Sequence, residues 1–337
     1  MFSFQTIHLF HRRLKIAEPS NSQLLKYAQT FDVALTSIEP LKLEASGRKY
    51  YRTISNKNSY VICYDDSQIN GQSVFVNRAT QLSNNNVRVP EIFKYDQDQF
   101  LTILEDVGDN SLINKKNFYQ DDSLILDVLG LLNSMHQSKL NNLDTTFAMG
   151  LESHTKRFSK IFCEEFLELE MFNEYQDFLS KLMPEVMNQQ WGNCHFDFER
   201  RNIHQLENHE LVLLDFQDLC FGPIGIDLAG ILIDHYIPCD LEVLKRHCKT
   251  FSQLSIFDMS PKETYQATCW GGLQRNLRIM GTLTNLYLRF DRPFRMQDIP
   301  QIVSNTITLS LELEQRHLSS FLKDTVLPKL KKKMSLL

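Results

Sequence analysis

The character of the chain changes near Gly108, and this change limits the possible folds more than any other feature of the sequence. β-Branched and aromatic residues predict strands before it, at residues 50–55, 59–63 and 100–105. Apolar residues recur with helical spacing after it, at residues 123–136, 151–183, 225–236, 260–290 and 303–322. A helix at about residues 73–82 and a short strand at residues 211–214 are the exceptions. The pattern predicts an α+β, bilobal protein, with a small, mostly β N-terminal lobe at residues 1–106 and a larger, mostly α C-terminal lobe at residues 107–337.

Composition places the chain among globular proteins and limits its partners. Its 337 residues are 42% hydrophobic and 23% charged, which is enough to bury the core of one bilobal domain. The formal charge of −5 argues against a dedicated nucleic-acid binder, because neutralising phosphates requires a basic surface. No stretch approaches the roughly 20 apolar residues of a membrane helix, and the first residues lack a signal-peptide core. We therefore expect a cytoplasmic protein with a small-molecule partner and no membrane partner.

Seven cysteines are spread along the chain without a C-x-x-C pair. This spacing predicts reduced thiols, most of them in the core, and neither a zinc site nor a disulfide framework. Cys194 lies beside the polar motif described next, where its neighbours have better-defined chemical roles than a cysteine nucleophile.

The densest polar motif lies at residues 195–218, on both sides of the predicted short strand. His195, Asp197 and Asn202 have the spacing H-x-D-x-x-x-x-N, and Asp215 and Phe216 follow the predicted hairpin as a D-F pair. The first spacing alone is a weak signal, but the D-F pair at a short distance across a hairpin makes coincidence rare. A polar loop that collects acids by chance is therefore a poorer explanation.

These side chains suit phosphoryl transfer, which needs a positioned hydroxyl, Mg²⁺ held against the phosphates and a proton acceptor. We predict that Asp197 lies against the attacking hydroxyl as an orienting group or base. Asn202 and Asp215 are predicted to supply oxygen ligands to Mg²⁺, and His195 to hold the loop through a hydrogen bond. The main alternative is a metallohydrolase with His195, Asp197 and Asp215 as ligands, which requires more nearby histidines than the sequence has.

Four blocks of sequence resemble the aminoglycoside phosphotransferase and choline kinase superfamily. They are more similar still to bacterial amino-sugar kinases, which phosphorylate the anomeric hydroxyl of N-acetylmuramate and N-acetylglucosamine. The blocks are A-S-G-R-K-Y-Y-R at residues 45–52, L-E-D-V-G-D at residues 104–109, L-D-F-Q-D at residues 214–218 and G-L-Q-R-N-L-R at residues 272–278. The resemblance covers most of the chain and implies a bilobal protein-kinase-like fold. It also implies an ATP- and Mg²⁺-dependent sugar kinase, a phosphotransferase with an alcohol group as acceptor, in peptidoglycan recycling.

The resemblance assigns two further groups of residues. Glu105, Asp106 and Val107 become the linker between the lobes, which offers main-chain groups to the adenine. Asp227 resembles an acidic residue that supports the catalytic loop, although an ordinary acid at a helix N-terminus explains it equally well.

The acceptor side of the predicted site departs from the family pattern. Glu199 stands where the amino-sugar kinases are expected to have His, and Arg200 and Arg201 follow it. This arginine pair is expected either to bind a carboxylate, such as the lactyl group of muramate, or to salt-bridge Glu199 and the surface. Gln274 and Arg275 lie on an otherwise apolar helix, where one of them faces the substrate or both form an interlobe or surface pair.

The phosphate-binding lysine of kinases is missing from this sequence. Residues 59–64 offer V-I-C-Y where that lysine is expected, and the following helix lacks its usual Glu partner. The amino-sugar kinases are also expected to lack this lysine. Arg48 and Arg52, together with Lys49, are therefore the candidates to place positive charge on the phosphates.

The leading prediction is a kinase that transfers the γ-phosphoryl group of ATP to the anomeric hydroxyl of an N-acetyl amino sugar. An aminoglycoside or other small-metabolite kinase of the same superfamily is one alternative, and a catalytically dead nucleotide-binding protein is another. The second alternative explains less, because a scaffold has no physical need for Asp197, Asn202 and Asp215 together. The exact acceptor and hydroxyl, the choice between ATP and GTP, and the oligomeric state stay open at this stage.

Overall fold

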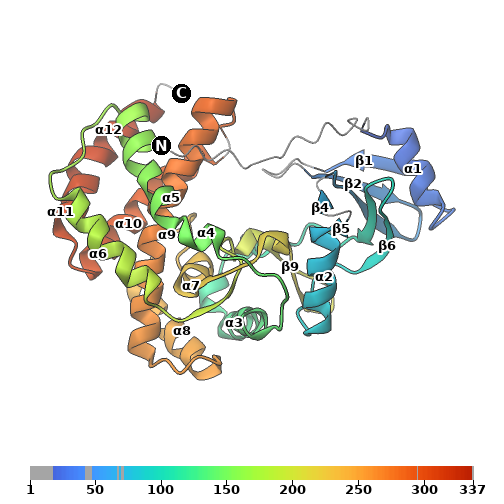
Figure 1. The fold of residues 1–337 in the computed structure, drawn as a ribbon, viewed down its shortest axis with the longest axis horizontal. Helices are drawn as coiled ribbons and strands as arrows, with labels where there is room; N and C mark the ends of the chain where they lie inside the picture. Colours follow the sequence, from blue (N-terminus) through green and yellow to red (C-terminus); the bar gives the residue numbers. More distant parts are fainter. Residues whose placement is uncertain (1–17, 42–47, 67, 70–71, 294, 336–337) are drawn as a thin grey trace. The chain divides into compact units, whose positions relative to one another are not determined.

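The chain forms two compact units in a computed structural model that describes residues 18–41, 48–66, 68–69, 72–293 and 295–335 (Figure 1). The first unit comprises residues 1–73 and 91–106, and the second comprises residues 74–90 and 107–337. Residues 45–47 of the predicted A-S-G-R-K-Y-Y-R block lie outside the described residues.

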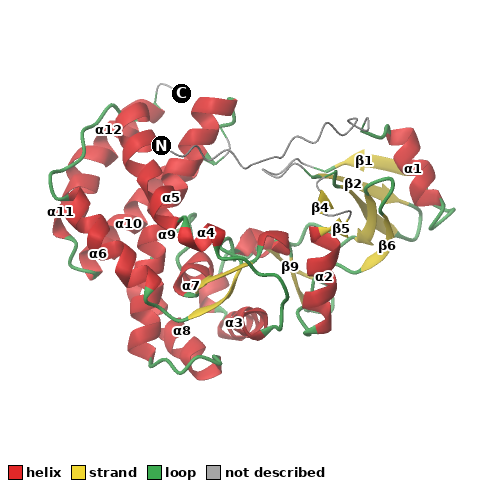
Figure 2. Ribbon diagram, in the orientation of Figure 1, coloured by secondary structure: helices red, strands yellow, loops and turns green. Residues whose placement is uncertain are grey.

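An antiparallel five-stranded sheet with strand order β1-β2-β3-β7-β6 forms the first unit, together with helix α1 (Figure 2). Its elements are α1 (Asn21–Gln29), β1 (Ser37–Pro40), β2 (Lys49–Ile54), β3 (Ser59–Tyr64), β6 (Ile92–Asp96) and β7 (Leu101–Glu105), with a two-stranded ribbon of β4 (Gln68–Ile69) and β5 (Gln72–Ser73). The predicted turn at residues 56–58 joins β2 to β3, and the register pairs Ile54 with Ser59. The predicted strands at residues 50–55, 59–63 and 100–105 correspond to β2, β3 and β7.

Helix α1 covers this sheet because one of its faces is apolar. Leu24 and Ala28 are fully buried against Ile62 of β3 and Ile103 of β7, which are neighbouring strands inside the sheet. The helix begins with a capping box at Ser20, whose side chain accepts from the main-chain N–H three residues on. Burying this apolar face is what holds α1 to the sheet, since a nine-residue helix is marginal on its own.

The second unit is mostly helical, as the spacing of apolar residues predicts. Its longer helices are α2 (Val74–Asn84), α3 (Asp122–Gln137), α5 (Leu151–Arg157), α6 (Tyr175–Met187), α7 (Gly225–Leu232), α8 (Leu241–Leu254), α9 (Pro261–Phe290), α10 (Ile299–Glu312) and α12 (Leu327–Met334). Shorter helical pieces are α4 (Thr146–Met149), α11 (Arg316–Ser320) and the π-helical segments Phe158–Phe166 and Phe321–Val326. Two antiparallel strand pairs lie among them, β8 (Trp191–Cys194) with β11 (Cys220–Pro223), and β9 (Ile203–Gln205) with β10 (Leu211–Leu213).

Helix α2 groups with the second unit, although it lies between β5 and β6 in the sequence. The ring of Phe75 in α2 stacks on the ring of Phe216 with centroids 5.1 Å apart, and both side chains are buried. Residues 74–90, predicted to belong to the N-terminal lobe, therefore fall in the second unit, and the first unit is built from two separate stretches of chain.

Helix α9 is the central element of the second unit. It runs for 30 residues from a capping box at Ser260, with Pro261 in its first turn, and it contacts α5, α6, α7, α8 and α10. Helix α7 approaches it closely, because a Cβ atom on Gly271 would overlap main-chain atoms of Gly225 and Ile226. Most of α9 between Thr264 and Thr284 is buried, so its charged residues must find partners inside the protein.

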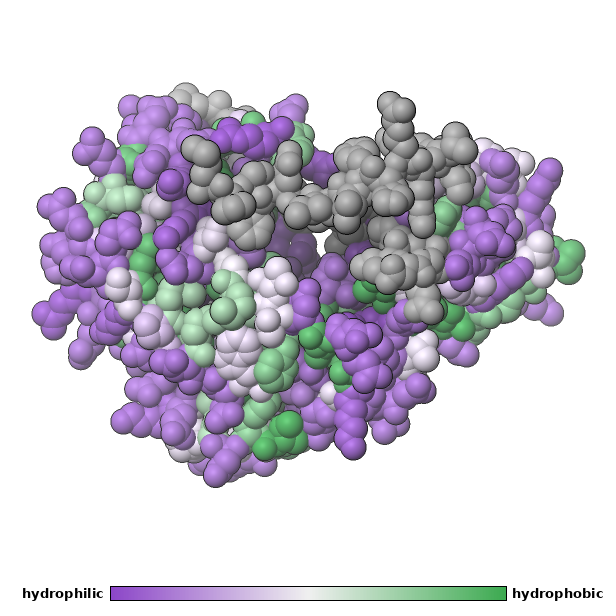
Figure 3. All heavy atoms as spheres, viewed as in Figure 1, coloured by the Kyte–Doolittle hydropathy of each residue, from purple (hydrophilic) through white to green (hydrophobic). Residues whose placement is uncertain are grey.

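Hydrophilic side chains cover most of the described surface in the view of Figure 3, and exposed hydrophobic residues are scattered. Within the described part of the chain, no helix has both the length and the apolar character to cross a membrane.

The predicted α+β class is confirmed, but α8 and α12 lie outside every predicted helix, and two of the predicted helices are interrupted. The helix expected at residues 151–183 is interrupted after Phe166, where Glu168 takes a left-handed conformation with φ of 55°. The helix expected at residues 303–322 is divided between α10 and α11 at Glu314, which also has a positive φ. The helical spacing of apolar residues continues across both breaks, and the turns themselves contain no Gly or Pro. The sequence therefore gives no signal that either helix is interrupted.

The contact of α7 with α9 predicts that Gly271→Ala destabilises the protein by about 1–3 kcal/mol, since the added methyl group meets main chain that cannot rotate away. Gly130→Ala in α3 is the matched control, because no atom lies within 4 Å of the position of its Cβ. The control is expected to be neutral or stabilising by about 0.4–1 kcal/mol. Urea unfolding of both variants measures the difference, and equal stability of the two would contradict the packing described.

Candidate active site

Two strand pairs hold the polar motif in place. The H-x-D loop follows β8, and the D-F turn follows β10. The N–H of Leu214 donates to the carbonyl of Asn202 at 2.8 Å. The carbonyl of Leu214 lies 2.9 Å from Nε2 of His195, so this histidine, protonated at Nε2, ties the H-x-D loop to the D-F turn. The role of His195 in holding the loop stays a prediction, and this contact favours it.

The carboxylate of Asp227, in the first turn of α7, holds the start of the H-x-D loop. Its side chain is fully buried and accepts the main-chain N–H groups of His195 at 2.7 Å and Phe196 at 2.6 Å. Phe196 takes a left-handed conformation with φ of 63°, which costs free energy for a residue with a side chain. Two charge-assisted hydrogen bonds to a buried carboxylate offset that cost. The predicted structural role of Asp227 therefore has a direct physical basis.

Asp197 follows this strained turn with its side chain only partly covered. The side chain is 43% exposed, in contrast to the buried residues on either side of it. The amide Nδ2 of Asn202 donates to the main-chain carbonyl of Asp197 at 2.9 Å, which fixes the direction of the loop. Arg275 and Arg278 of α9 each place a guanidinium nitrogen 3.8 Å from Oδ1 of Asp197. The site thus combines an accessible carboxylate with a rigid backbone and two nearby positive charges.

Asn202 and Asp215 offer the donor atoms that a hard cation requires. The hydrogen bond from Nδ2 of Asn202 leaves its Oδ1 as an acceptor. Asp215 has a left-handed φ of 56°, and its Oδ1 accepts from Nε2 of Gln217 at 2.8 Å, which orients the carboxylate. Oxygen ligands from one amide and one carboxylate suit Mg²⁺, which retains several waters of its own. The second unit by itself therefore carries a donor set that fits the predicted metal.

Glu199 lies at the centre of a buried ion-pair cluster. Its side chain is 5% exposed and contacts Arg201, Arg275 at 3.0 Å and Arg295 at 3.3 Å. Burial alone would raise the pKa of Glu199, but the surrounding guanidinium groups, Arg201 first, hold that pKa below its ordinary value. Burial and the charge of Arg275 lower the pKa of the adjacent His235, so this histidine adds no charge at neutral pH.

These contacts bear on the residues predicted to face the substrate. Glu199 and Arg275 are buried and engaged with each other, and Gln274 is fully buried with its Nε2 donating to Oγ1 of Thr155 at 2.9 Å. Arg201 is bound to Glu199. Direct contact of these side chains with a substrate stays a prediction, whereas their positions favour support of the catalytic loop from within the protein.

Other groups of potential ligands have different roles. Among the described residues, the group of His, Cys, Asp and Glu side chains close enough to share a metal is His136, Cys194 and Asp227, not His195, Asp197 and Asp215. In this group both Asp227 oxygens already accept main-chain hydrogen bonds, and Sγ of Cys194 donates to the carbonyl of Gly222. Burial raises the pKa of the Cys194 thiol, as expected for a core cysteine. The geometry therefore gives no support to the metallohydrolase alternative.

The sequence of both units matches one family model. Residues 37–259 match the model described as the phosphotransferase enzyme family, and this stretch includes the sheet of the first unit and all of the polar motif. The chain belongs to the phosphotransferase enzyme family. The enzyme class predicted from the motifs is thereby confirmed.

Two relatives that are named for their activity are similar to this chain in sequence. An N-acetylmuramate/N-acetylglucosamine kinase from Neisseria meningitidis is 25% identical over 282 residues, which cover 77% of this chain and 82% of the relative. A protein of the same name from Pseudomonas aeruginosa is 23% identical, with coverage of 80% and 82%. The predicted resemblance to amino-sugar kinases is confirmed by these relatives.

Solved structures of other phosphotransferases share the fold. A Plasmodium vivax ethanolamine kinase has a TM-score of 0.62 at 14% identity and covers 91% of this chain and 94% of its own. A spectinomycin phosphotransferase in complex with ADP and spectinomycin has a TM-score of 0.59 at 10% identity, with coverage of 88% and 99%. The predicted bilobal protein-kinase-like fold is therefore confirmed.

In this phosphotransferase, the cations predicted to contact nucleotide phosphates already have acidic neighbours within the first unit. Arg52 of β2 forms an ion pair with Asp106, with Nε 2.7 Å from Oδ2, and its Nη2 donates a hydrogen bond to Oδ1 at 3.0 Å. A nitrogen of Arg48 lies 4.0 Å from the carboxylate of Asp65. Asp106 is thus tied back to the sheet, and Glu105 accepts the main-chain N–H of residue 91 through its side chain.

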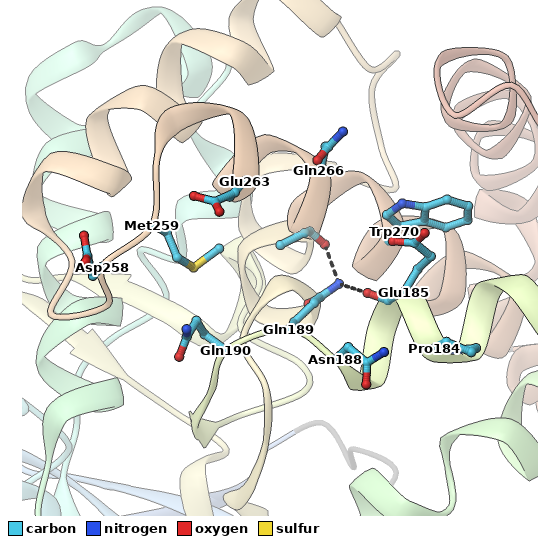
Figure 4. Close-up of a pocket in the computed structure, with 11 residues that line it drawn as sticks. Pro184, Glu185, Asn188, Gln189, Gln190, Asp258, Met259, Glu263, Gln266 and Trp270 are labelled. Atoms are coloured by element: carbon cyan, nitrogen blue, oxygen red, sulfur yellow. Dashed lines mark hydrogen bonds between the residues drawn. The ribbon is translucent and has the colours of Figure 1, made fainter.

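A separate pocket of about 340 Å³ lies on the second unit (Figure 4). Figure 4 shows Gln189, which follows α6, with its Nε2 donating at 3.1 Å to two carbonyls, those of Glu185 in α6 and Ala267 in α9. Its Oε1 accepts the N–H of Gly225 at 3.2 Å, so one wall of the pocket fixes the start of α7. None of the predicted site residues lines this pocket.

Sequence reasoning missed the parts of the site that depend on distant contacts. The pairing of β8 with β11 and the positions of Arg278 and Arg295 near the catalytic loop have no local signal. One sign was present: a helix buried on all sides that carries several arginines needs acidic partners, and Glu199 in the loop is such a partner.

The cluster around Glu199 predicts that Glu199→Gln lowers the free energy of unfolding by about 3–5 kcal/mol at pH 7, because the buried guanidinium groups lose their counter-ion. Since the folded-state pKa of Glu199 is lowered, its contribution is fully present above the ordinary value of 4.5 and is lost as the pH falls below it. The difference between wild type and variant, measured by urea unfolding, should therefore shrink below pH 4.5.

The matched control is Glu165→Gln, which removes the surface pair of Glu165 with Arg289, whose side chains are 42% and 50% exposed. Exposed pairs contribute about 0–1 kcal/mol, so this variant should unfold nearly as the wild type does. A loss at Glu199→Gln no larger than at Glu165→Gln would show that the cluster is not a counter-ion network.

Proposed function

We propose that this phosphotransferase uses ATP and Mg²⁺ to phosphorylate the anomeric hydroxyl of an N-acetyl amino sugar, N-acetylmuramate or N-acetylglucosamine, in peptidoglycan recycling. The observation that carries the proposal is the half-exposed carboxylate of Asp197 on a loop held by Asp227, with Asn202 and Asp215 nearby in the sequence of the same motif. The names of the relatives supply the acceptor, and family membership supplies the reaction class.

The proposed reaction needs little from Asp197 beyond position and one proton. The hydroxyl oxygen of the sugar forms a bond to the γ-phosphorus of ATP, and the bond from that phosphorus to the bridging oxygen of ADP breaks. The hydroxyl proton passes to a carboxylate oxygen of Asp197. Mg²⁺ held by Asn202 and Asp215 would supply neutralisation of phosphate charge. The hydrogen bond from Asn202 to the carbonyl of Asp197 couples the two functions, because a shift of the metal ligand moves the base.

The first unit is proposed to contribute the nucleotide contacts. Main-chain groups of Glu105, Asp106 and Val107 would meet the adenine, as the resemblance implies. Arg48 and Arg52 remain the candidates for contact with the phosphates. Arg52 is held by Asp106, so its contact would be coupled to the position of the linker.

The charge beside Asp197 disfavours the aminoglycoside alternative. Aminoglycosides carry several ammonium groups, and their kinases need an acidic acceptor cleft. Here Arg275 and Arg278 lie 3.8 Å from Oδ1 of Asp197, and both are buried, so their field is only weakly screened by solvent. A neutral or anionic acceptor suits this environment better than a polycation.

The site assignment predicts that Asp197→Asn lowers kcat by about 10²–10⁴-fold with little change in the KM for ATP, because the proton acceptor is lost and the metal ligands remain. Asp215→Asn should raise the Mg²⁺ concentration needed for half-maximal rate as well, since a charged ligand becomes neutral. Steady-state kinetics with coupled detection of ADP measures both. Asp127→Asn, at an exposed position of α3, is the control expected to behave as wild type. Normal turnover in both site variants would remove the assignment.

The acceptor is tested with the purified protein and a panel of N-acetylmuramate, N-acetylglucosamine, free hexoses, choline and kanamycin. Release of ADP only with the N-acetyl sugars is expected, and the product should lose the reactivity of a reducing end because the anomeric oxygen is phosphorylated. A product that keeps its reducing end would move the reaction to another hydroxyl. Turnover of choline or kanamycin instead would replace the proposed acceptor, and absence of turnover across the panel would contradict the proposed function.

A further inference from the structure

The arginine pair expected to bind a carboxylate of the acceptor is occupied inside the protein. Arg200 pairs with Asp234, and its guanidinium lies over the rings of Phe118 and Tyr119 at 5.3 and 5.7 Å. Arg201 pairs with Glu199. A positive charge near Asp197 that is less engaged within the protein would therefore suit an anionic acceptor better than this pair.

Arg278 of α9 lies beside Asp197, but this contact does not use all of its hydrogen-bond donors. One of its nitrogens donates to the carbonyl of Phe196 at 3.0 Å and lies 3.8 Å from Oδ1 of Asp197. The guanidinium carbon lies over the ring of Phe147, 5.3 Å from its centroid, so the group contacts both this ring and the catalytic loop. Its Nε is buried and makes no hydrogen bond among the described residues. The position of Arg278 is thus fixed while part of its donor capacity is unused.

Arg157 is a second arginine next to this one, on the last turn of α5. Helix α5 crosses α9 so closely that a Cβ on Gly281 would touch the main chain and Cβ of Arg157. Gly281 follows Arg278 by three residues, about one helical turn, so Arg157 and Arg278 lie on the same contact between the two helices. Half-buried Arg157 has no hydrogen-bond or ion-pair partner in the described part of the chain. A cation removed from water without a counter-ion costs stability, which is tolerated where a ligand supplies the anion.

His154 completes this corner, one turn before Arg157 on α5. Its ring lies 4.8 Å from the ring of Phe147, and its side chain is buried. Burial first, and then the charges of Arg157 and Arg278, lower the pKa of His154 to about 4. At neutral pH the histidine is therefore uncharged, and the two arginines carry the charge of the corner. Burial lowers the pKa of Arg278, and the charge of Arg157 lowers it further, so the two arginines lie close enough to interact electrostatically.

The geometry points to a subsite for the carboxylate of the acceptor sugar, formed by Arg157 and Arg278 beside Asp197. This inference rests on the proposed function and names the feature that would distinguish its two sugars. N-Acetylmuramate carries a lactyl carboxylate on the oxygen attached to C3, two ring carbons from the anomeric carbon, and N-acetylglucosamine carries none. Such an acceptor requires two neighbouring sites, with its hydroxyl at Asp197 and its carboxylate at an anion site beside Asp197. Two guanidinium groups bind a carboxylate more strongly than neutral donors do.

The test compares kcat/KM for the two sugars in the wild type and in Arg157→Gln. The variant should lose about 10- to 100-fold of kcat/KM with N-acetylmuramate, the loss typical of one charge-assisted hydrogen bond, and should keep its value with N-acetylglucosamine. Arg157→Lys retains the charge and should recover most of the loss. Lys156→Gln is the matched control, because Lys156 is its exposed neighbour, paired with Glu152 on the same helix. Thermal unfolding of each variant confirms that the fold is retained.

Each outcome decides for or against the subsite. An equal loss with both sugars would overturn it, because Arg157 would then act on a step common to both, and an unchanged ratio of the two values would overturn it as well. A rise in the KM for ATP with the sugar ratio preserved would assign the charge to the nucleotide phosphates instead. If the wild type phosphorylates both sugars but the ratio does not respond, only this inference fails. If the wild type neither binds nor phosphorylates either sugar in titration and turnover, the proposed function fails with it.

Discussion

The buried carboxylate of Asp227 is the interaction on which the candidate site depends. It accepts the main-chain N–H groups of His195 and Phe196 and so satisfies two donors that a tight turn leaves without partners. The turn is unfavourable for Phe196, whose φ is positive, and it is this turn that leaves the side chain of Asp197 accessible while its neighbours are buried. An accessible acid on an ordinary loop would sample many directions, whereas here the direction is set by hydrogen bonds to a charge that cannot reach water. A fixed position is what the fold supplies to Asp197.

Helix α9 transmits this order to the rest of the second unit. Its glycine at 271 allows α7, and with it Asp227, to lie against the helix without an intervening side chain. Its arginines at 275 and 278 reach back to the catalytic loop, where one neutralises Glu199 and the other donates to the carbonyl of Phe196. The catalytic loop is therefore held by the carboxylate of Asp227 and by the guanidinium groups of Arg275 and Arg278. These groups are buried, so a substitution at any of them leaves its partners without a hydrogen bond or a counter-ion. We expect this loss, and not a change in the shape of the loop, to be the main effect on the other groups.

The sequence alone predicted the features that depend on residues close together in the chain. The strand and helix periodicities gave the α+β class, and the spacing of His195, Asp197, Asn202 and Asp215 placed them on one hairpin and its flanks, as found. Asp227 could be read equally as a helix cap, because nothing in its neighbourhood reveals that its acceptors are used by a strand end 32 residues earlier. The partners of Glu199 and the isolated charge of Arg157 were missed for the same physical reason. Ion pairs and helix crossings of this kind join residues far apart in the chain, and a single sequence carries no trace of which distant charges meet.

The first unit is assembled from two stretches of chain, and this has a consequence for synthesis on the ribosome. Strand β3 pairs with β7, with Tyr64 opposite Leu101, so one edge of β3 has no partner until the chain has been made as far as Glu105. The residues along that edge are apolar, and an unpaired apolar edge is a template for pairing with another chain. Helix α2 leaves the ribosome in the interval and must wait longer still, because the Phe216 ring on which Phe75 stacks is made much later. The nascent chain thus carries an unpaired strand edge and an unpacked helix at the same time. Aggregation is favoured most in this interval of translation, so chaperone binding has its largest effect there.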